Sequence, residues 1–184
     1  MPTSPTGNVV FREVQQFRQI WLWAMVLAWP GIMTAILGYG LVRRLVFGYC
    51  MDQSAAWSTE ALIVGFVVPL LVSLALSWLL YAMKLITEVR ADGLHVRFWP
   101  LPWRRIGFEE ITEYWPRTYR PIREYGGWGI RWGLGGKAYN VSGNQGVQLV
   151  LDRGRRLLIG SRRAEELAAA VGDARAARAG REPH

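Results

Sequence analysis

Two long apolar segments dominate the pattern of hydrophobic and polar positions along the chain. They run from Ile20 to Val42 and from Ala61 to Met83, and neither contains Asp, Glu, Lys or Arg. As helices they would each span about 34 Å, enough to cross the roughly 30 Å hydrocarbon core of a bilayer. A helix of a small soluble domain would show a polar face, and these segments have none. The pattern therefore predicts two transmembrane helices.

Aromatic and basic side chains mark the ends of both segments. Trp21 and Trp78 are examples of the amphipathic aromatic residues that collect at the headgroup level of a bilayer. The connector between the segments carries Arg43 and Arg44, whereas the side of the two termini carries Arg12, Arg18, Lys84, Arg90, Arg97, Arg104 and Arg105. This bias predicts a multi-pass protein of the cell membrane, with two spans and with both termini in the cytoplasm.

Small residues recur on one face of the first apolar segment. Their spacing of three or four positions places them on a single stripe of a helix: Ala24, Ala28, Gly31, Ala35 and Gly38. Short side chains allow two helix backbones to approach closely. We expect the stripe to face the second segment in a helical hairpin, or a second copy of the chain in a homo-oligomer.

The residues before the first apolar segment form an N-terminal tail, residues 1–19. Residues 1–8 are polar and contain two prolines, so we expect them to be disordered. Val10, Val14 and Phe17 recur at helical spacing. This spacing predicts a short helix at the membrane interface over residues 9–19.

After the transmembrane hairpin of residues 20–83, the pattern changes to short β-like segments over residues 84–174. The expected strands cover residues 85–89, 94–99, 103–107, 111–119, 128–132, 137–141, 146–151 and 155–160. A helix follows, with Ser161 as its N-cap and with an apolar face that includes Leu167, Val171 and Ala174. The polar tail of residues 175–184 is expected to be disordered.

This order of elements indicates a fold class. Seven or eight short strands followed by one closing helix are typical of a pleckstrin-homology-like (PH-like) barrel. Lipocalin-like and OB barrels are the main rivals, but they do not normally end on a single closing helix. The sequence thus predicts a membrane α hairpin followed by an all-β, PH-like barrel with a C-terminal helix.

Several segments of this domain resemble a known family. They are EYGGWGIR at Glu124–Arg131, AYNVSGNQGVQL at Ala138–Leu149 and LLIGS at Leu157–Ser161, preceded by DGLHVRFWPLPWRRIGFEEI at Asp92–Ile111. With these segments the chain resembles a family of small uncharacterised prokaryotic membrane proteins, which have two N-terminal transmembrane helices and a bacterial PH-like cytoplasmic domain. The resemblance implies a fold and a location. It implies no activity and no catalytic residues.

Composition and motifs point away from catalysis. Cys50 is the only cysteine, and His95 and His184 are the only histidines, which is too few ligands for a zinc site. Gly127 could begin a nucleotide-binding G-x-G-x-x-G motif, but Trp132 occupies the position of its third glycine. The net charge is +8, which next to a bilayer favours anionic lipid headgroups over nucleic acid. We therefore expect no catalytic residues, no cofactor, no metal ion and no enzymatic activity.

The best candidate for a binding site is the segment between Tyr119 and Trp132, which is rich in Gly, Trp and Arg. Arginine and aromatic residues anchor protein interfaces, and glycine lets a partner approach the backbone. The candidate partner-binding residues are Tyr119, Arg120, Arg123, Tyr125, Trp128 and Arg131. A structural interpretation is the commoner one for such a segment: its glycines form bulges on an edge strand, and its tryptophans belong to the core.

Together these observations favour a non-enzymatic, membrane-anchored PH-like module. It would bind a protein partner or anionic headgroups at the inner face of the membrane. The alternative is a structural subunit whose helical hairpin packs into a larger membrane complex.

Overall fold

The structure is a computed structural model that describes residues 9–47, 59–133 and 135–180. The chain divides into two compact units. One unit is Arg18–Tyr81, and the other combines Met1–Phe17 with Ala82–His184. The residues on both sides of the predicted hairpin therefore belong to one unit. Cys50, the connector around it and the tail of residues 1–8 lie outside the described residues.

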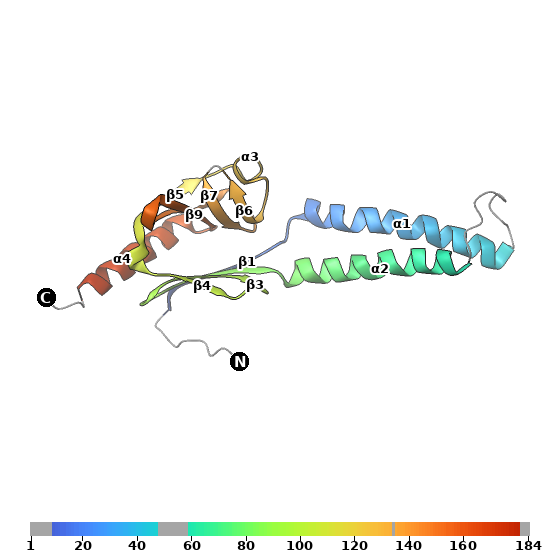
Figure 1. The fold of residues 1–184 in the computed structure, drawn as a ribbon, viewed down its shortest axis with the longest axis horizontal. Coiled ribbons are helices and arrows are strands. Elements are labelled where there is room, and N and C mark those ends of the chain that lie inside the picture. The colour runs from blue at the N-terminus through green and yellow to red at the C-terminus, as the bar shows by residue number, and fades with distance from the viewer. Residues whose placement is uncertain (1–8, 48–58, 134, 181–184) are drawn as a thin grey trace. The chain divides into compact units, whose positions relative to one another are not determined.

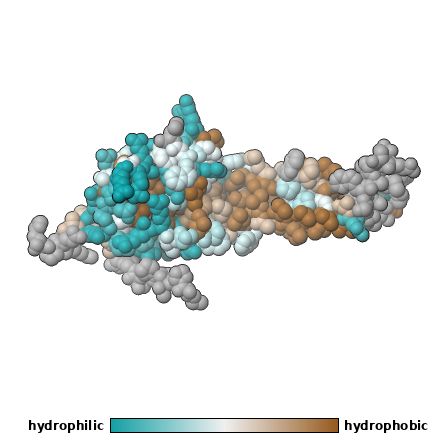
Figure 2. All heavy atoms as spheres, viewed as in Figure 1, coloured by the Kyte–Doolittle hydropathy of each residue, from teal (hydrophilic) through white to brown (hydrophobic). Residues whose placement is uncertain are grey.

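Both apolar segments form helices, α1 (Ile20–Phe47) and α2 (Thr59–Ala82). Each contains a window that is long and apolar enough to cross a membrane, Ile20–Gly40 and Ile63–Ala82. Among the described residues, no part of either window is buried within the protein, unlike the core helix of a soluble domain. Figure 2 shows brown, apolar atoms along these helices and teal atoms over the β-rich unit.

The small-residue stripe of α1 meets α2 near one end only. A Cβ added to Gly38 would lie 3.0 Å from the ring of Phe66, and one added to Gly65 would lie 3.6 Å from Leu37. A Cβ added to Gly31 would meet no atom within 4 Å, and the alanines of the stripe are exposed. The predicted contact within the hairpin is therefore present at Gly38, and the rest of the stripe is exposed.

The prediction of an interfacial helix before α1 is wrong. This segment forms the strand β1 (Val9–Gln16), which pairs antiparallel with β2 (Lys84–Arg90). The pairing runs to the ends of both strands, where Gln16 lies opposite Lys84. The two-helix hairpin is thus an insertion between the first two strands of one sheet.

Burial along β1 explains why the segment is a strand. Phe11, Gln15 and Phe17 are buried, whereas Val10 and Val14 are exposed. Burial at odd-numbered positions is the alternation of a half-buried strand, so the helical spacing of the valines has no role in the core. The Gln15 side chain donates a hydrogen bond of 2.9 Å to the carbonyl oxygen of Gly160, which fastens β1 to the far end of the domain sequence.

The β-rich unit contains two sheets and a closing helix (Figure 1). Sheet A has the strand order β1-β2-β3-β4, and sheet B has the order β5-β8-β9-β7-β6, in which β7 and β9 are parallel. The further elements are β3 (Gly93–Trp99), β4 (Trp103–Ile106), a 3-10 turn (Phe108–Glu110), β5 (Ile111–Thr118), α3 (Pro121–Tyr125), β6 (Gly129–Gly133), β7 (Gly136–Asn140), β8 (Gln145–Leu151), a second 3-10 turn (Asp152–Gly154), β9 (Arg155–Gly160) and α4 (Ala164–Ala179).

All eight strands predicted after the hairpin are present, as β2 to β9. The predicted closed barrel is not: in the described residues no strand of sheet A pairs with a strand of sheet B. The single turn α3 was not predicted either. The coarse fold class, two apolar helices with a β-rich domain and a C-terminal helix, is confirmed.

Helix α4 packs one face into the core of the domain. Leu167 and Val171 on this face are fully buried. The helix begins at Ala164 and not next to Ser161, whose hydroxyl accepts a hydrogen bond of 3.0 Å from the Arg163 amide. The helix also continues to Ala179, so the prediction of a disordered tail from residue 175 is wrong for its first five residues.

Pairing register arranges the side chains of sheet A in rows across the strands. Residues directly opposite each other in an antiparallel pair project from the same face. One face carries a charged row, Arg12, Glu88, His95 and Arg105. The next row on this face is Val14, Ile86, Arg97 and Trp103, and the last is Gln16, Lys84 and Trp99. The opposite face supplies the core, with Phe11, Val89, Leu94 and Ile106 in one row.

Candidate functional site

The residues predicted to bind a partner lie in and around α3 and β6. Pro121 starts the single turn of α3, because its fixed φ suits the first helical position. Gly126 ends it with a φ of 70°, in the left-handed region that favours glycine. A Cβ added to Gly133 of β6 would clash with the carbonyl oxygen of Glu124, so α3 and β6 pack in direct contact.

Two of the predicted contact residues are core residues instead. Tyr119 and Tyr125 are 1% and 3% exposed and form a buried cluster with Ala138 and Leu158. Their rings meet edge to face, with centroids 5.9 Å apart. Burial raises the pKa of Tyr119 to about 12, and it also raises the pKa of Tyr125. The two tyrosines therefore support this region from beneath and do not face a partner.

Hydrogen bonds hold the backbone of this region in place. Glu124 forms an ion pair with Arg117 of β5 and accepts a 2.7 Å hydrogen bond from the Arg120 amide. The Trp128 indole donates to the Gly143 carbonyl at 3.1 Å, and the Trp128 carbonyl accepts from Arg131 Nε at 3.1 Å. Trp128 is thus half-buried and anchored at its polar end, as the structural interpretation expects for part of the segment.

The remaining predicted residues are accessible. Arg120, Arg123 and Arg131 are exposed. Ile122 of α3 and Trp132 of β6 are exposed at 69% and 76%, the highest values among the large apolar side chains described in the β-rich unit. We call the set Arg120, Ile122, Arg123, Arg131 and Trp132 the α3–β6 surface.

The sequence analysis placed Trp132 at the end of the candidate segment but not among the six candidate partner-binding residues, and it did not single out Ile122. Ile122 has no distinguishing pattern, because a single turn of helix is too short to show a periodicity. Trp132 sits on an edge strand of sheet B and lies over the ammonium group of Lys137, whose Nζ is 5.1 Å from the ring centroid. In the sequence, the only signal that the Trp132 ring is exposed was its position near a turn and near the cation of Lys137.

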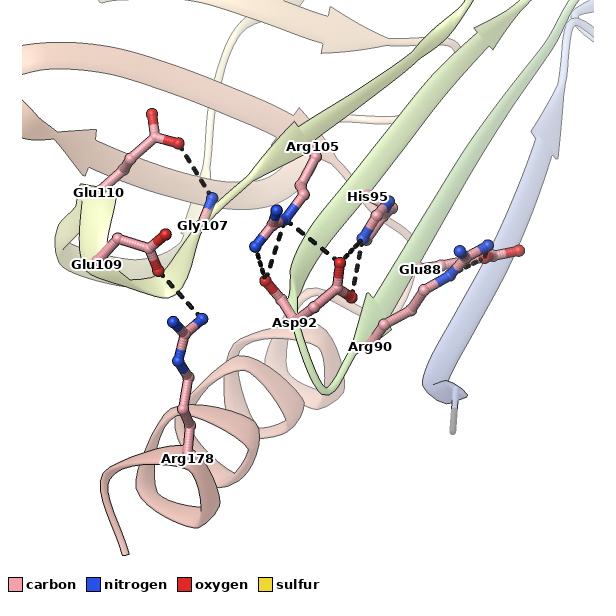
Figure 3. A network of polar contacts seen from close by, with 9 residues as sticks. All are labelled: Glu88, Arg90, Asp92, His95, Arg105, Gly107, Glu109, Glu110 and Arg178. Carbon is pink, nitrogen blue, oxygen red and sulfur yellow. Dashed lines mark hydrogen bonds and ion pairs between the residues drawn. The ribbon is translucent and has the colours of Figure 1, made fainter. Parts of the chain in front are cut away.

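A second group of charged residues lies on sheet A and at its distal turn (Figure 3). Glu88 and Arg90 are buried, and Arg90 Nε donates to Glu88 at 2.9 Å. Asp92 lies between His95 and Arg105, with His95 Nε2 3.1 Å from its carboxylate and Arg105 Nη2 2.9 Å from its carbonyl oxygen.

This group fastens the fold. Burial raises the pKa of Asp92, but the hydrogen bond and charge of His95, together with Arg105, outweigh burial and hold it below its ordinary value. Arg178 of α4 pairs with Glu109 at 3.2 Å, which ties the closing helix to the turn before β5. The acidic and basic side chains of this group therefore pair with one another within the protein.

A shallow groove of about 490 Å³ lies between β5 and the start of α4. Three arginines line it, and each has a partner within the protein. Arg117 pairs with Glu124, Arg163 with Glu166, and Arg162 donates to the Ser142 hydroxyl at 3.2 Å. Carboxylates therefore balance the charges of Arg117 and Arg163, whereas the Arg162 guanidinium meets a neutral hydroxyl.

Metal ligands do not cluster in the part of the chain that the structure describes. No group of three or more His, Cys, Asp or Glu side chains there could hold an ion. The α3–β6 surface combines exposed apolar side chains with exposed cationic side chains.

Comparison with known proteins places the chain in a family. The family described as "Family of unknown function (DUF6141)" matches residues 2–178. The chain belongs to this family. The DUF6141 match covers both apolar helices and the β-rich unit, including β1. No curated protein matches the sequence. No solved structure matches it either.

Proposed function

We propose that this DUF6141 member is a two-span protein of the cell membrane whose cytoplasmic, PH-like domain binds a protein partner through the α3–β6 surface. The module is a non-enzymatic binding domain. The observation that carries the proposal is the exposure of Ile122 and Trp132, at 69% and 76%, on two elements that pack against each other and also present three exposed arginines.

The composition of this surface is that of an interface anchor. Tryptophan and arginine dominate the small number of residues that supply most binding energy, and isoleucine adds apolar area beside them. Solvent exposure of Trp132 leaves its apolar area hydrated, at a cost of roughly 25 cal/mol per Å² that a partner could recover by burying it. The tyrosine pair beneath gives the surface a packed, pre-ordered base.

The membrane arrangement is supported by the connection between sheet A and the hairpin. Residues 17–19 alone separate β1 from α1, and Met83 alone separates α2 from β2. Since β1 and β2 are neighbours, both ends of the hairpin leave from adjacent strands, so they emerge on one side of a membrane. The basic residues beside these ends favour the cytoplasmic side.

The PH-like assignment is supported by element order. A four-stranded antiparallel sheet, a second sheet and a C-terminal helix that packs into the core follow each other along the chain. In this assignment the domain is an open, two-sheet variant, and its parallel β7–β9 pair is an additional feature.

A second candidate function is a structural subunit of a larger membrane complex. It is favoured by the exposed small-residue stripe of α1, in which a Cβ added to Gly31 would meet no atom within 4 Å. In this case the hairpin, and not the α3–β6 surface, makes the principal contact.

Photocrosslinking in native membranes distinguishes the two. A benzophenone side chain is placed at Trp132, at Trp115 as a matched control on β5 that is 39% exposed, and at Ala28 of α1. We expect a discrete protein adduct from position 132 and none from position 115. Adducts from position 28 alone would favour the structural subunit, and adducts only with lipid at position 132 would contradict the protein-binding proposal.

The arginines are tested in the same assay. Replacing Arg123 and Arg131 together with alanine should reduce the adduct from position 132 several-fold. Because both side chains are exposed, the stability of the protein should change by no more than about 0.5 kcal/mol for each. A large fall in melting temperature would show instead that the arginines are structural.

A further inference from the structure

The turn between β3 and β4, residues Trp99–Trp103, projects from the same end of sheet A as the connections to the two apolar helices. Lys84 lies opposite Gln16 on one side and opposite Trp99 on the other. Gln16 is the last residue before the connection to α1, and Lys84 follows the connection from α2. The β2–β3 turn, at Ala91 and Asp92, lies at the other end of the sheet, about 20 Å away along a seven-residue strand.

The two turns differ in chemistry. The β3–β4 turn exposes Leu101 and Trp103, at 47% and 37%, and it also exposes two prolines. The β2–β3 turn is polar and carries the Asp92–Arg105 pair. The rows on the outer face of sheet A change in the same direction, from a charged row near Asp92 to a row in which Val14, Ile86 and Trp103 accompany one cation, Arg97.

Two arginines and His95 pack against the ring of Trp103, which keeps 37% of its surface exposed. The guanidinium carbons of Arg90 and Arg97 lie 5.4 Å and 5.7 Å from the centroid of the Trp103 ring. Lys84 occupies the row next to Arg97. A tryptophan beside Lys and Arg is the combination found at the headgroup level of bilayers, where the ring is half in contact with acyl chains and the cations meet phosphate groups.

Few backbone groups of the turn need a hydrogen bond from water. Pro100 and Pro102 have no amide N–H, and the Leu101 amide donates a 2.8 Å hydrogen bond to the Phe98 carbonyl. The Leu101 carbonyl accepts a 3.2 Å hydrogen bond from Arg97 Nε. A backbone polar group without a partner is costly to place in an apolar medium, and this turn lacks two N–H groups and pairs both backbone groups of Leu101.

We propose that the β3–β4 turn inserts Leu101 and Trp103 into the interfacial layer of the bilayer and forms a third membrane attachment of the chain. The occupant of this apolar patch is thus lipid, with its phosphate groups facing Lys84 and Arg97. The inference rests on the proposed function in one respect, that α1 and α2 cross the membrane. It is independent of the α3–β6 surface, which uses other residues.

A fluorescent label at the tip of each turn tests the proposal in the full-length protein. In a Cys50→Ser background, Leu101→Cys or the matched control Ala91→Cys is labelled with an environment-sensitive nitrobenzoxadiazole dye; both positions are exposed turn residues of sheet A. The variants are reconstituted into vesicles of phosphatidylcholine and phosphatidylglycerol, with and without brominated phosphatidylcholine as quencher. We expect a blue-shifted emission and a several-fold larger loss of intensity by quenching at position 101 than at position 91.

Equal quenching at the two positions would overturn the proposal. A blue shift at position 101 without quenching would place the turn against protein, and would overturn it as well. Extraction of the same vesicles with alkaline carbonate separates this test from the proposed function. Release of the protein contradicts the membrane spans, whereas a retained protein with an unquenched label contradicts only the attachment of the turn.

Discussion

Gln16 and Lys84 lie opposite each other as the terminal pair of the β1–β2 ladder, although 67 residues, 17–83, separate them in the sequence. All but a few of those residues belong to the two apolar helices and their connector. The first β-hairpin of the domain is therefore closed by a helical hairpin in place of a turn. Because of this pairing, β1 belongs to the β-rich domain. The helical hairpin is the segment that brings β1 and β2 together.

The helical hairpin should be replaceable by a short turn. Joining Phe17 to Met83 through Asn-Gly extends the ladder by one pair and closes it with a two-residue turn of the favoured type. We expect this shortened protein to unfold cooperatively and to give a mainly β far-UV circular dichroism spectrum with one helix.

A matched variant that begins at Lys84 lacks β1 and provides the control. It loses the side chains of Phe11 and Phe17 from the core and leaves one edge of β2 unpaired, so it should melt at a much lower temperature or aggregate. Equal melting temperatures for the two variants would contradict a structural role for β1.

Glu88 should be essential for stability, whereas its exposed partner should not. Glu88→Ala leaves Arg90 buried without its carboxylate, which typically costs about 3–5 kcal/mol. Arg12→Ala removes the other partner of Glu88, but the Arg12 side chain is 62% exposed, so the cost should be at most about 1 kcal/mol. Denaturant unfolding of both variants in detergent micelles measures the difference. Similar costs for the two would show that the Glu88–Arg90 pair contributes little.

Tyr119→Phe should leave stability at neutral pH nearly unchanged and improve it in alkali. The buried hydroxyl lies close to Asn140 but makes no hydrogen bond of ordinary geometry, so its loss should cost less than about 1 kcal/mol. The folded pKa of Tyr119 is about 12, against 10.0 for an unperturbed tyrosine. The folded state therefore holds its proton more tightly, and the stability it contributes is complete below pH 10 and is lost as the pH rises towards 12.

The control for this alkaline effect is Tyr139→Phe. Burial raises the pKa of Tyr139, but hydrogen bonds with Lys137 and Arg104 lower it more, so its folded pKa is below the ordinary value. Removing this hydroxyl should therefore give no protection against alkali. Melting temperatures of both variants and the unmodified protein between pH 7 and pH 11.5 test the pair; equal alkaline sensitivity of the Tyr119 variant and the unmodified protein would contradict the prediction.

Cys50 should react with a membrane-impermeant maleimide on intact cells. It lies in the connector between the two apolar segments, outside the described residues, and the distribution of basic residues favours the outer side for that connector. Since it is the only cysteine, labelling reports on one position. A denatured sample establishes that the thiol is reactive, and labelling that requires permeabilised cells would reverse the orientation.

The candidate site was only partly predictable. Sequence composition located the segment from Tyr119 to Trp132 and the exposed arginines within it, because Arg and Gly are enriched there. It did not separate Tyr125, which is buried, from Trp132, which is exposed. Both are aromatic residues near glycines, and only the packing of α3 against β6 decides which ring has space in the core.

The sequence by itself determined the elements whose signal is local. Unbroken apolar composition predicts α1 and α2, and alternation with turn residues predicts β2 to β9, since a helix or a strand forms from neighbours along the chain. The tertiary structure decided what depends on distant contacts. Residues 9–16 show helical spacing, yet they form β1 because Lys84–Arg90 offers an open strand edge and Gly160 accepts the buried Gln15 side chain. The strand that pairs with residues 9–16 follows 67 residues later, so these residues carry no local periodicity that would reveal the pairing. The first strand, and with it the position of the helical hairpin in the fold, could therefore be identified only from the structure.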